Sequence, residues 1–142
     1  MEGIVFENVS KDYKQGEQAI RALNNVSIAV HPGQFVAVIG PSGSGKSTFL
    51  SIAGALLKPS EGNVMINGIR LSDLGPKELA KLRLEHIGFI FQSSNLVPYL
   101  TVLDQLLVVK KMKGSITHED RRFAQALLEE VGLGDKLDKF PK

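Results

Sequence analysis

The sequence contains no cysteine, and its 17 basic and 15 acidic residues leave a net charge of only +2. Without cysteine the chain forms no disulfide bond, no thiolate metal site and no cysteine nucleophile. A charge balance this close to zero gives no support to a nucleic-acid-binding stripe or a polybasic membrane patch. We therefore expect no nucleic acid among the partners of this chain.

The sequence also shows no sign of a signal peptide or a membrane span. The stretch from Met1 to Asn8 carries acidic side chains and no basic one, whereas a secretory signal begins with a basic region. No apolar run approaches the ~20 residues that a membrane-spanning helix needs. We therefore expect a cytoplasmic protein.

The composition is typical of a globular domain. Hydrophobic residues make up 43% of the sequence and charged residues 23%, and both values are ordinary for a folded domain. A length of 142 residues suits one domain or a large part of one. We expect a buried core and little disorder.

Short apolar patterns predict strands in the first two thirds of the chain. Residues 35–39 are almost continuously apolar, as in a strand that is buried on both faces of a parallel sheet. Residues 31–34 contain Pro and Gly and predict a turn, and Asn67-Gly68 is typical of a hairpin turn. The other predicted strands cover residues 4–9, 26–30, 63–66 and 87–91.

Apolar residues at helical spacing predict helices at residues 46–57, 76–85, 101–112 and 117–131. Thr117 can cap the last of these, because acidic residues follow it in the first turn. The character of the chain changes after Gln92, from alternating strands and helices to helices alone. The pattern predicts an α/β fold with a mixed sheet, followed by a helical stretch.

A glycine-rich loop lies between the apolar run at 35–39 and the helix predicted at 46–57. It fits the pattern G-x-x-x-x-G-K-[ST] with Gly40, Pro41, Ser42, Gly43, Ser44, Gly45, Lys46 and Ser47. Glycines permit positive φ angles and let the backbone approach phosphate oxygens closely. Successive N–H groups then form an anion-binding nest at the N-terminus of a helix. The loop predicts binding of a nucleoside triphosphate as Mg·ATP.

Side chains at the end of this loop have distinct expected roles. The Lys46 ammonium is expected between the β- and γ-phosphates, the Ser47 hydroxyl on Mg²⁺, and Thr48 near a phosphate closer to the base. The alternative is a glycine-rich turn with an exposed lysine. The predicted buried strand before the loop and the amphipathic helix after it favour the phosphate-binding interpretation.

The loop at 40–48 and three further segments resemble the ATP-binding subunits of ATP-binding-cassette (ABC) transporters. The further segments are Pro32-Gly33-Gln34, Pro59-Ser60-Glu61-Gly62 and Ile87-Gly88-Phe89-Ile90-Phe91-Gln92. The resemblance runs across the whole chain and covers the N-terminal part of a normal cassette, somewhat over half of it. It implies a P-loop NTPase fold of the ABC nucleotide-binding type, with N-terminal antiparallel strands, an incomplete parallel core sheet and the start of a helical subdomain.

The resemblance implies a division into an ATP-binding core at residues 1–94 and the start of the α-helical subdomain at 95–142. Tyr13 falls where the family stacks an aromatic ring on adenine, and the alternative is a partly exposed tyrosine at a strand end. Gln92 falls at the glutamine of the Q-loop, which ligates Mg²⁺ or orients the attacking water. Lys46 and Gln92 are therefore the expected catalytic residues, and Ser47 and Gln92 the expected metal ligands.

The implied function is coupling of Mg·ATP binding and hydrolysis to export or import through a separate integral-membrane permease. The family works as a homodimer of ATP-binding subunits, peripheral on the inner face of the cell membrane. The apolar stretch around Tyr99 is either a surface for the permease or the internal core of the helical subdomain.

Residues 87–100 are most similar to the group that exports lipoproteins, macrolides or haem, and among these to the hemin-transport ATPases of Gram-positive bacteria. This similarity implies haem or hemin as a transported substrate. The histidines show no metal-ligand spacing, and we expect them to be ordinary surface or turn residues: His31, His86 and His118.

Three parts of the family's site would follow residue 142: the Ser-Gly-Gly signature, the Walker B strand with its acidic residues, and the switch histidine. We therefore expect a chain cut before the signature, with unpaired apolar sheet surface and a tendency to aggregate. Whether the chain hydrolyses ATP by itself stays open. The alternatives are a truncated nucleotide-binding module without hydrolytic activity, a P-loop kinase, and a soluble ABC protein of repair or translation.

Overall fold

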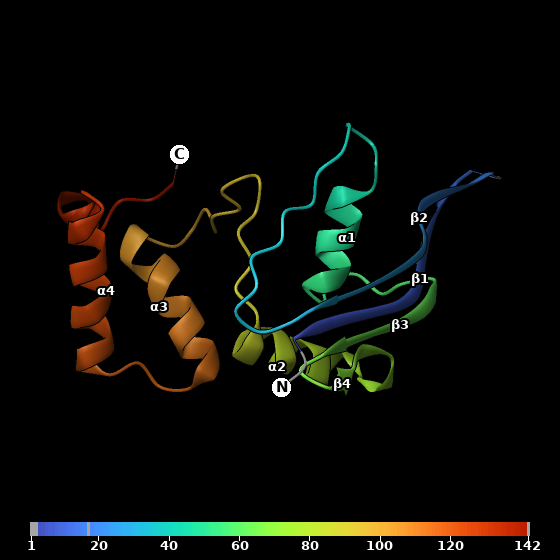
Figure 1. Ribbon diagram of the computed structural model, residues 1–142. Coiled ribbons are helices and arrows are strands. Elements are labelled where there is room, and N and C mark those ends of the chain that lie inside the picture. The colour runs from blue at the N-terminus through green and yellow to red at the C-terminus, as the bar shows by residue number, and fades with distance from the viewer. Residues whose placement is uncertain (1–2, 17, 142) are drawn as a thin grey trace. The chain divides into compact units, whose positions relative to one another are not determined.

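The computed structural model describes residues 3–16 and 18–141 of the chain (Figure 1). The chain divides into two compact units, Met1–Phe89 and Ile90–Lys142. Each unit is described by itself below. No helix in the described part of the chain is long and apolar enough to cross a membrane.

The first unit is built on an antiparallel sheet of four strands in the order β2-β1-β3-β4. The strands are β1 (Ile4–Gln15), β2 (Gln18–Val30), β3 (Glu61–Ile66) and β4 (Ile69–Arg70). Strand β1 is central, because Ile4 pairs with Val30 of β2 on one side and with Ile66 of β3 on the other. The predicted strands at 4–9, 26–30 and 63–66 are confirmed, and all three begin earlier or end later than predicted.

Strand β1 is irregular near its middle. Its register with β2 shifts between Phe6 and Val9, and Asn8 has a φ angle of 51°. The hydroxyl of the buried Ser10 accepts a hydrogen bond of 3.0 Å from the backbone N–H of Asn25. This partly buried hydrogen bond satisfies polar groups that the shifted register leaves outside the regular ladder.

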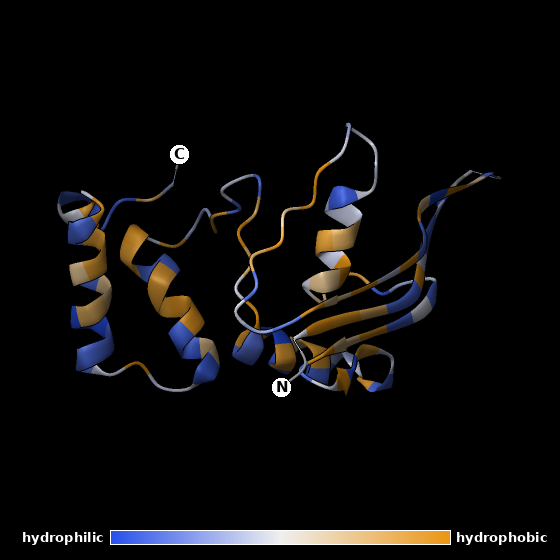
Figure 2. Cartoon of the chain, in the orientation of Figure 1, coloured by the Kyte–Doolittle hydropathy of each residue, from blue (hydrophilic) through white to orange (hydrophobic). Residues whose placement is uncertain are grey.

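The core of the first unit lies between the sheet and its helices, α1 (Lys46–Ala53) and α2 (Pro76–His86). Apolar residues recur along the strands and in the middle of α1 (Figure 2). Phe6 of β1 stacks on Phe49 of α1 with ring centres 4.7 Å apart, and such aromatic pairs add to the free energy gained from burial. The fully buried large side chains are Phe6, Val9, Ile52 and Val64.

Helix α2 begins as the sequence predicts, with Pro76 in its first turn. The backbone N–H of Gly75 donates to the Glu78 carboxylate at 2.7 Å and so fixes the start of the helix. Near the other end, Arg83 Nη1 donates to the carbonyl oxygen of Ala55 at 2.9 Å. This bond ties α2 to the segment that follows α1.

The strands predicted at 35–39 and 87–91 are not formed, and this prediction is wrong for the structure. Both segments lack regular secondary structure, and the described strands pair only in the antiparallel sense. Phe35 is 97% exposed and Ile90 97% exposed. A continuous apolar pattern indicates burial on both faces, but a strand exists only when neighbouring strands pair with it. In the described part of the chain, neither segment belongs to a strand.

The second unit contains the helices α3 (Val102–Lys113) and α4 (His118–Glu130) and a short 3₁₀ turn, η2 (Gly134–Lys136). A similar 3₁₀ turn, η1 (Leu71–Asp73), follows β4 in the first unit. Thr101 and Thr117 cap the two helices through their side-chain oxygens. Both helices confirm the predictions to within one residue at their first position. The boundary between the compact units lies between Phe89 and Ile90 in the sequence. The division into an ATP-binding core at 1–94 and a helical subdomain at 95–142 is implied by the family resemblance and stays a prediction.

Candidate nucleotide-binding site

The glycine-rich loop leads from the exposed segment 35–39 into the first turn of α1. Its glycines take positive φ angles, 152° at Gly40, 80° at Gly43 and 89° at Gly45. Gly45 is the N-cap of α1 in the left-handed conformation, and its carbonyl oxygen accepts the first helical hydrogen bond from Phe49 N–H at 2.8 Å. The predicted P-loop is thus a nest-like turn followed directly by a helix.

Gly45 also lies where no larger residue fits. A Cβ atom at this position would come within 2.4 Å of the Ala22 carbonyl oxygen and 3.1 Å of Leu23 Cδ2. Strand β2 therefore packs directly against the point where the loop becomes α1. This close approach fixes the direction in which the N-terminal N–H groups of α1 point.

The Lys46 side chain folds back into the loop. Its Nζ atom donates to the carbonyl oxygens of Gly40 at 2.8 Å and Pro41 at 2.6 Å, and it lies 3.5 Å from Ser44 Oγ. The loop therefore surrounds an ammonium group. Because phosphate oxygens are stronger acceptors than neutral carbonyls, this cation can exchange its loop contacts for a phosphate.

The N-terminus of α1 fits an anion as well. The helix has no side-chain cap at its N-terminus and no acidic residue in its first turn. Its first N–H groups and its positive end therefore remain available to a negatively charged group. Ser47 is exposed in this turn and Thr48 is half-buried. Pro41, Ser42 and Ser44 of the loop are exposed.

Tyr13 lies beside this helix. Its Oη atom is 3.3 Å from Thr48 Oγ1, although 35 residues separate the two in the sequence. The side chain is 42% exposed, and Lys11 Nζ lies 5.6 Å from the centre of its ring. The structure thus brings the expected adenine-stacking residue to the expected phosphate-binding helix.

Gln92 belongs to the second unit, so its position relative to the loop is not described. It is exposed and lies in a bend outside helices and strands. Its role at the Mg²⁺ site stays a prediction. Among the residues that the structure describes, no group of three His, Cys, Asp or Glu side chains lies close enough to hold a metal ion.

An ion-pair cluster near Tyr13 was not predicted from the sequence. Arg21 of β2 binds Asp12 of β1 through two hydrogen bonds, of 2.8 Å from Nε and 2.9 Å from Nη2, and its Nη2 lies 3.6 Å from Glu61. The hydrogen bond from Arg21 holds the pKa of Asp12 below its ordinary value. The pair of Asp12 and Arg21 could have been predicted from the hairpin register, because the two residues lie opposite each other on β1 and β2. Likewise, Lys11 shares a strand face with Tyr13 at a spacing of two.

The chain is similar to known proteins over most of its length. The profile of the ABC transporter family matches residues 23–142. An uncharacterised ABC transporter ATP-binding protein of Methanocaldococcus jannaschii, MJ0796, is 49% identical over 96% of this chain and 58% of its own length. A putative hemin import ATP-binding protein of Staphylococcus haemolyticus is 46% identical over 96% of this chain and 61% of its own length.

A solved structure shares the fold. It is the dimeric ATP-binding cassette MJ0796 in a post-hydrolysis state with ADP and Pi, and it matches with a TM-score of 0.89 and 42% identity over 97% of this chain and 61% of that chain. The chain thus spans about three fifths of the length of these relatives. It has part of the ABC nucleotide-binding fold, including the antiparallel N-terminal strands. The chain belongs to the ABC transporter family.

Proposed function

We propose that the chain is the ATP-binding part of an ABC transporter and that its loop at 40–47 holds the phosphates of Mg·ATP. The observation that carries the proposal is the position of Lys46, whose ammonium lies inside the loop at 2.8 Å and 2.6 Å from two loop carbonyls. A loop that encloses a cation at the N-terminus of an uncapped helix is suited to a polyphosphate. When bound, Mg·ATP supplies a phosphoanhydride bond that can be hydrolysed.

Each residue has a role in this proposal. Lys46 binds the β- and γ-phosphates, and the loop N–H groups cradle them. Ser47 is the proposed Mg²⁺ ligand in the loop, and Gln92 is proposed to ligate Mg²⁺ or to orient the attacking water. Tyr13 is proposed to stack on adenine. The proposed roles of Tyr13 and Lys46 are supported by their positions within the first unit. Tyr13 contacts Thr48, which belongs to the helix that begins at Lys46.

The test is nucleotide binding by the purified chain, measured by isothermal titration calorimetry with Mg·ATP. Lys46→Ala removes the enclosed cation and should weaken binding by about tenfold or more, because a charge-assisted contact contributes about 1.5–3 kcal/mol. Lys77→Ala is the matched control, since Lys77 is an exposed lysine of α2. Equal affinity of the wild type and Lys46→Ala for ATP would contradict the proposal.

Binding without turnover is the second candidate for this chain, and one observation favours it. The loop is surrounded by apolar and small residues of β2 and of segment 35–39, with no carboxylate among them. The described residues that line this hollow therefore include no carboxylate that could serve as a general base for water. Phosphate release by the purified chain that disappears in Lys46→Ala would exclude this candidate.

We further propose that the protein works as a homodimer on the inner face of the cell membrane, together with a separate permease. Hemin is the proposed cargo, supported by the 46% identity to the putative hemin import protein. Relatives with 42% and 40% identity are named for macrolide export and lipoprotein release. Hemin-stimulated ATP hydrolysis by the ATPase–permease complex would support hemin as cargo, and stimulation by a macrolide alone would contradict it.

A further inference from the structure

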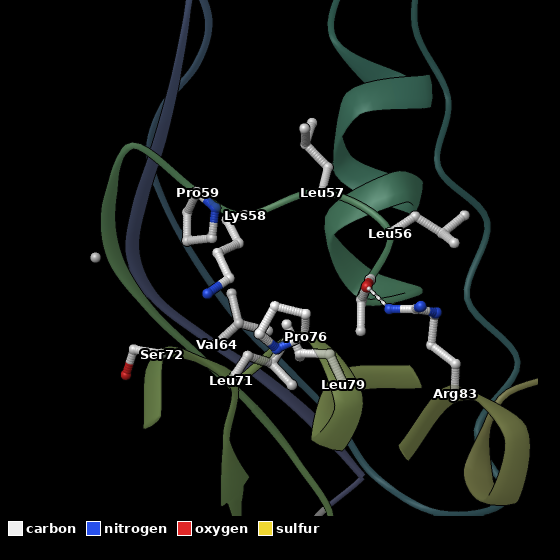
Figure 3. A pocket seen from close by; sticks show the side chains of 12 residues that line it. Leu56, Leu57, Lys58, Pro59, Val64, Leu71, Ser72, Pro76, Leu79 and Arg83 are labelled. Atoms are coloured by element: carbon white, nitrogen blue, oxygen red, sulfur yellow. Dashed lines mark hydrogen bonds between the residues drawn. The ribbon is translucent and has the colours of Figure 1, made fainter. Parts of the chain in front are cut away.

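A second pocket lies in the first unit, away from the phosphate loop (Figure 3). It has a volume of about 430 Å³ and is formed by the segment after α1, the start of β3, the turn η1 and helix α2. Small-molecule sites typically have volumes of 300–1,000 Å³. Helix α1 separates the two sites, because the loop is at its N-terminus and the pocket follows its C-terminus.

The floor of this pocket is apolar. Val64 of β3, Leu71 of η1 and Leu79 of α2 line it, and they are only 1%, 4% and 7% exposed. Their burial shows that the pocket reaches down to the core of the unit. The apolar surface that a ligand can cover belongs to the more exposed walls, Leu56, Leu57 and Pro76, where each Å² removed from water gains about 25 cal/mol.

The charge of the pocket has one sign. Lys58 and Arg83 are the charged residues that line it, and no aspartate or glutamate does. In Figure 3 the Lys58 side chain extends over the pocket toward Val64 and Pro76, while the Arg83 side chain rises from α2 on the other side. Two cations over an apolar floor select for a ligand that has both an apolar body and a negative head.

Both cations have capacity for a ligand. Arg83 uses Nη1 to bind the Ala55 carbonyl oxygen at 2.9 Å, and a guanidinium has five N–H donors. Among the described residues no side-chain nitrogen or oxygen is both buried and without a partner, so the remaining N–H groups of Arg83 reach solvent. Lys58 fixes the pocket wall by its backbone, because its carbonyl oxygen accepts a 2.9 Å hydrogen bond from Lys11 Nζ.

We propose that this pocket binds a small amphipathic carboxylate. Its apolar body lies against the walls at Leu56, Leu57 and Pro76, above the apolar floor, and its carboxylate pairs with Lys58 on one side of the pocket. The site does not depend on nucleotide binding, since none of these residues belongs to the phosphate loop.

Decanoate is a suitable probe, and its binding to the full chain can be followed by ¹H–¹⁵N correlation spectra. We expect saturable shifts at the amides of Ala55, Leu71 and Leu79. Decanol, which has the same tail without the charge, should bind about tenfold more weakly, and acetate should cause no saturable shift. Equal affinity for decanol and decanoate, shifts confined to residues outside the pocket, or no saturable binding would each overturn the proposal.

Substitutions of the two basic residues distinguish the effect of charge on binding from an effect on folding. Lys58→Gln keeps the backbone carbonyl that Lys11 binds and should weaken decanoate binding about fivefold to tenfold, with decanol binding unchanged. Arg83→Gln should weaken decanoate binding less than Lys58→Gln does, because Arg83 lies on the other side of the pocket and binds the Ala55 carbonyl oxygen. Lys77→Gln, in the same helix as Arg83 but outside the pocket, is the control. Wild-type affinity of Lys58→Gln for decanoate would overturn the assigned role of the cations.

Discussion

At the level of single residues, two glycines of the phosphate loop differ in what surrounds them. Gly43 and Gly45 both have positive φ angles, 80° and 89°, but a Cβ atom would meet nothing within 4 Å at Gly43 and would lie 2.4 Å from the Ala22 carbonyl oxygen at Gly45. Alanine at either position costs about 1–2 kcal/mol for the left-handed backbone. Only at Gly45 does the substitution also displace β2.

We therefore expect Gly45→Ala to lower the melting temperature by several degrees more than Gly43→Ala, as measured by circular dichroism. The comparison controls for backbone strain, because that cost is shared. The same melting temperature for both variants would show that β2 does not hold the end of the loop.

Tyr13 allows a test of adenine stacking that does not involve the phosphates. Tyr13→Ala should weaken ATP binding by about 5–100-fold, because stacking of a base on an aromatic ring contributes about 1–3 kcal/mol. Tyr13→Phe keeps the ring and loses only the 3.3 Å contact with Thr48, so it should bind nearly as the wild type does. Tripolyphosphate lacks the base and serves as the control ligand in the same titration. If Tyr13→Ala weakened both ligands equally, Tyr13 would be a structural residue at the end of a strand.

The sequence predicted which residues form the loop, but not where the Lys46 side chain lies. The glycine spacing determines that the backbone can turn and face an anion. The contacts of Lys46 with Gly40 and Pro41 arise because a long cationic side chain takes the nearest acceptors. Their identity depends on the folded loop and not on spacing.

At the level of elements, the helices α3 and α4 are joined by one ion pair. Lys110 Nζ lies 2.9 Å from Asp120 Oδ1, and Asp120 also accepts hydrogen bonds from the N–H and hydroxyl of Thr117. These contacts, the one with Lys110 foremost, lower the pKa of Asp120 from 3.8 to about 2. The ionised carboxylate therefore stabilises the helix pair above pH 3.8, and this contribution is lost as the pH falls from 3.8 through about 2.

Asp120→Asn should remove this part of the pH dependence. We expect the variant to be less stable than the wild type at pH 5 and the difference to shrink toward pH 2, in thermal melts followed by circular dichroism. Glu119→Gln is the control, since Glu119 is an acid of the same helical turn. A difference that stayed constant from pH 5 to pH 2 would contradict the assignment to Asp120.

Helices and antiparallel hairpins were predictable because their signals are local. Caps such as Thr101 and Thr117 and the turn at Asn67-Gly68 act within a few residues of themselves. The strands predicted at 35–39 and 87–91 did not form, because a strand depends on pairing with segments that can be far away in the sequence, and an apolar run does not reveal them. An apolar run shows that a segment needs burial, and it does not show that the burial partner is present.

At the level of the whole molecule, the exposed apolar segment has a consequence for association. Phe35 is 97% exposed and Ile39 89% exposed, and neither belongs to a strand. Unpaired backbone beside large apolar side chains favours pairing between chains. We expect the purified chain to self-associate as its concentration rises, which sedimentation velocity measures directly.

The double variant Phe35→Lys, Ile39→Lys should shift the chain toward the monomer. Met112→Lys, at a 68% exposed position of α3, is the control for a general gain in charge. A monomeric wild type with a cooperative melting transition at high temperature would contradict this prediction.

The pairing of β1 changes along its length. Strand β3 accompanies it as far as Ser10, opposite Glu61, and from Lys11 onward only β2 pairs with it. Tyr13 therefore stands on a two-stranded ribbon that can open without unfolding the three-stranded part. Deuterium uptake by backbone amides should rise in a step after Ser10. Slower deuterium uptake around Tyr13 in the presence of ATP would indicate that adenine binds to this two-stranded ribbon.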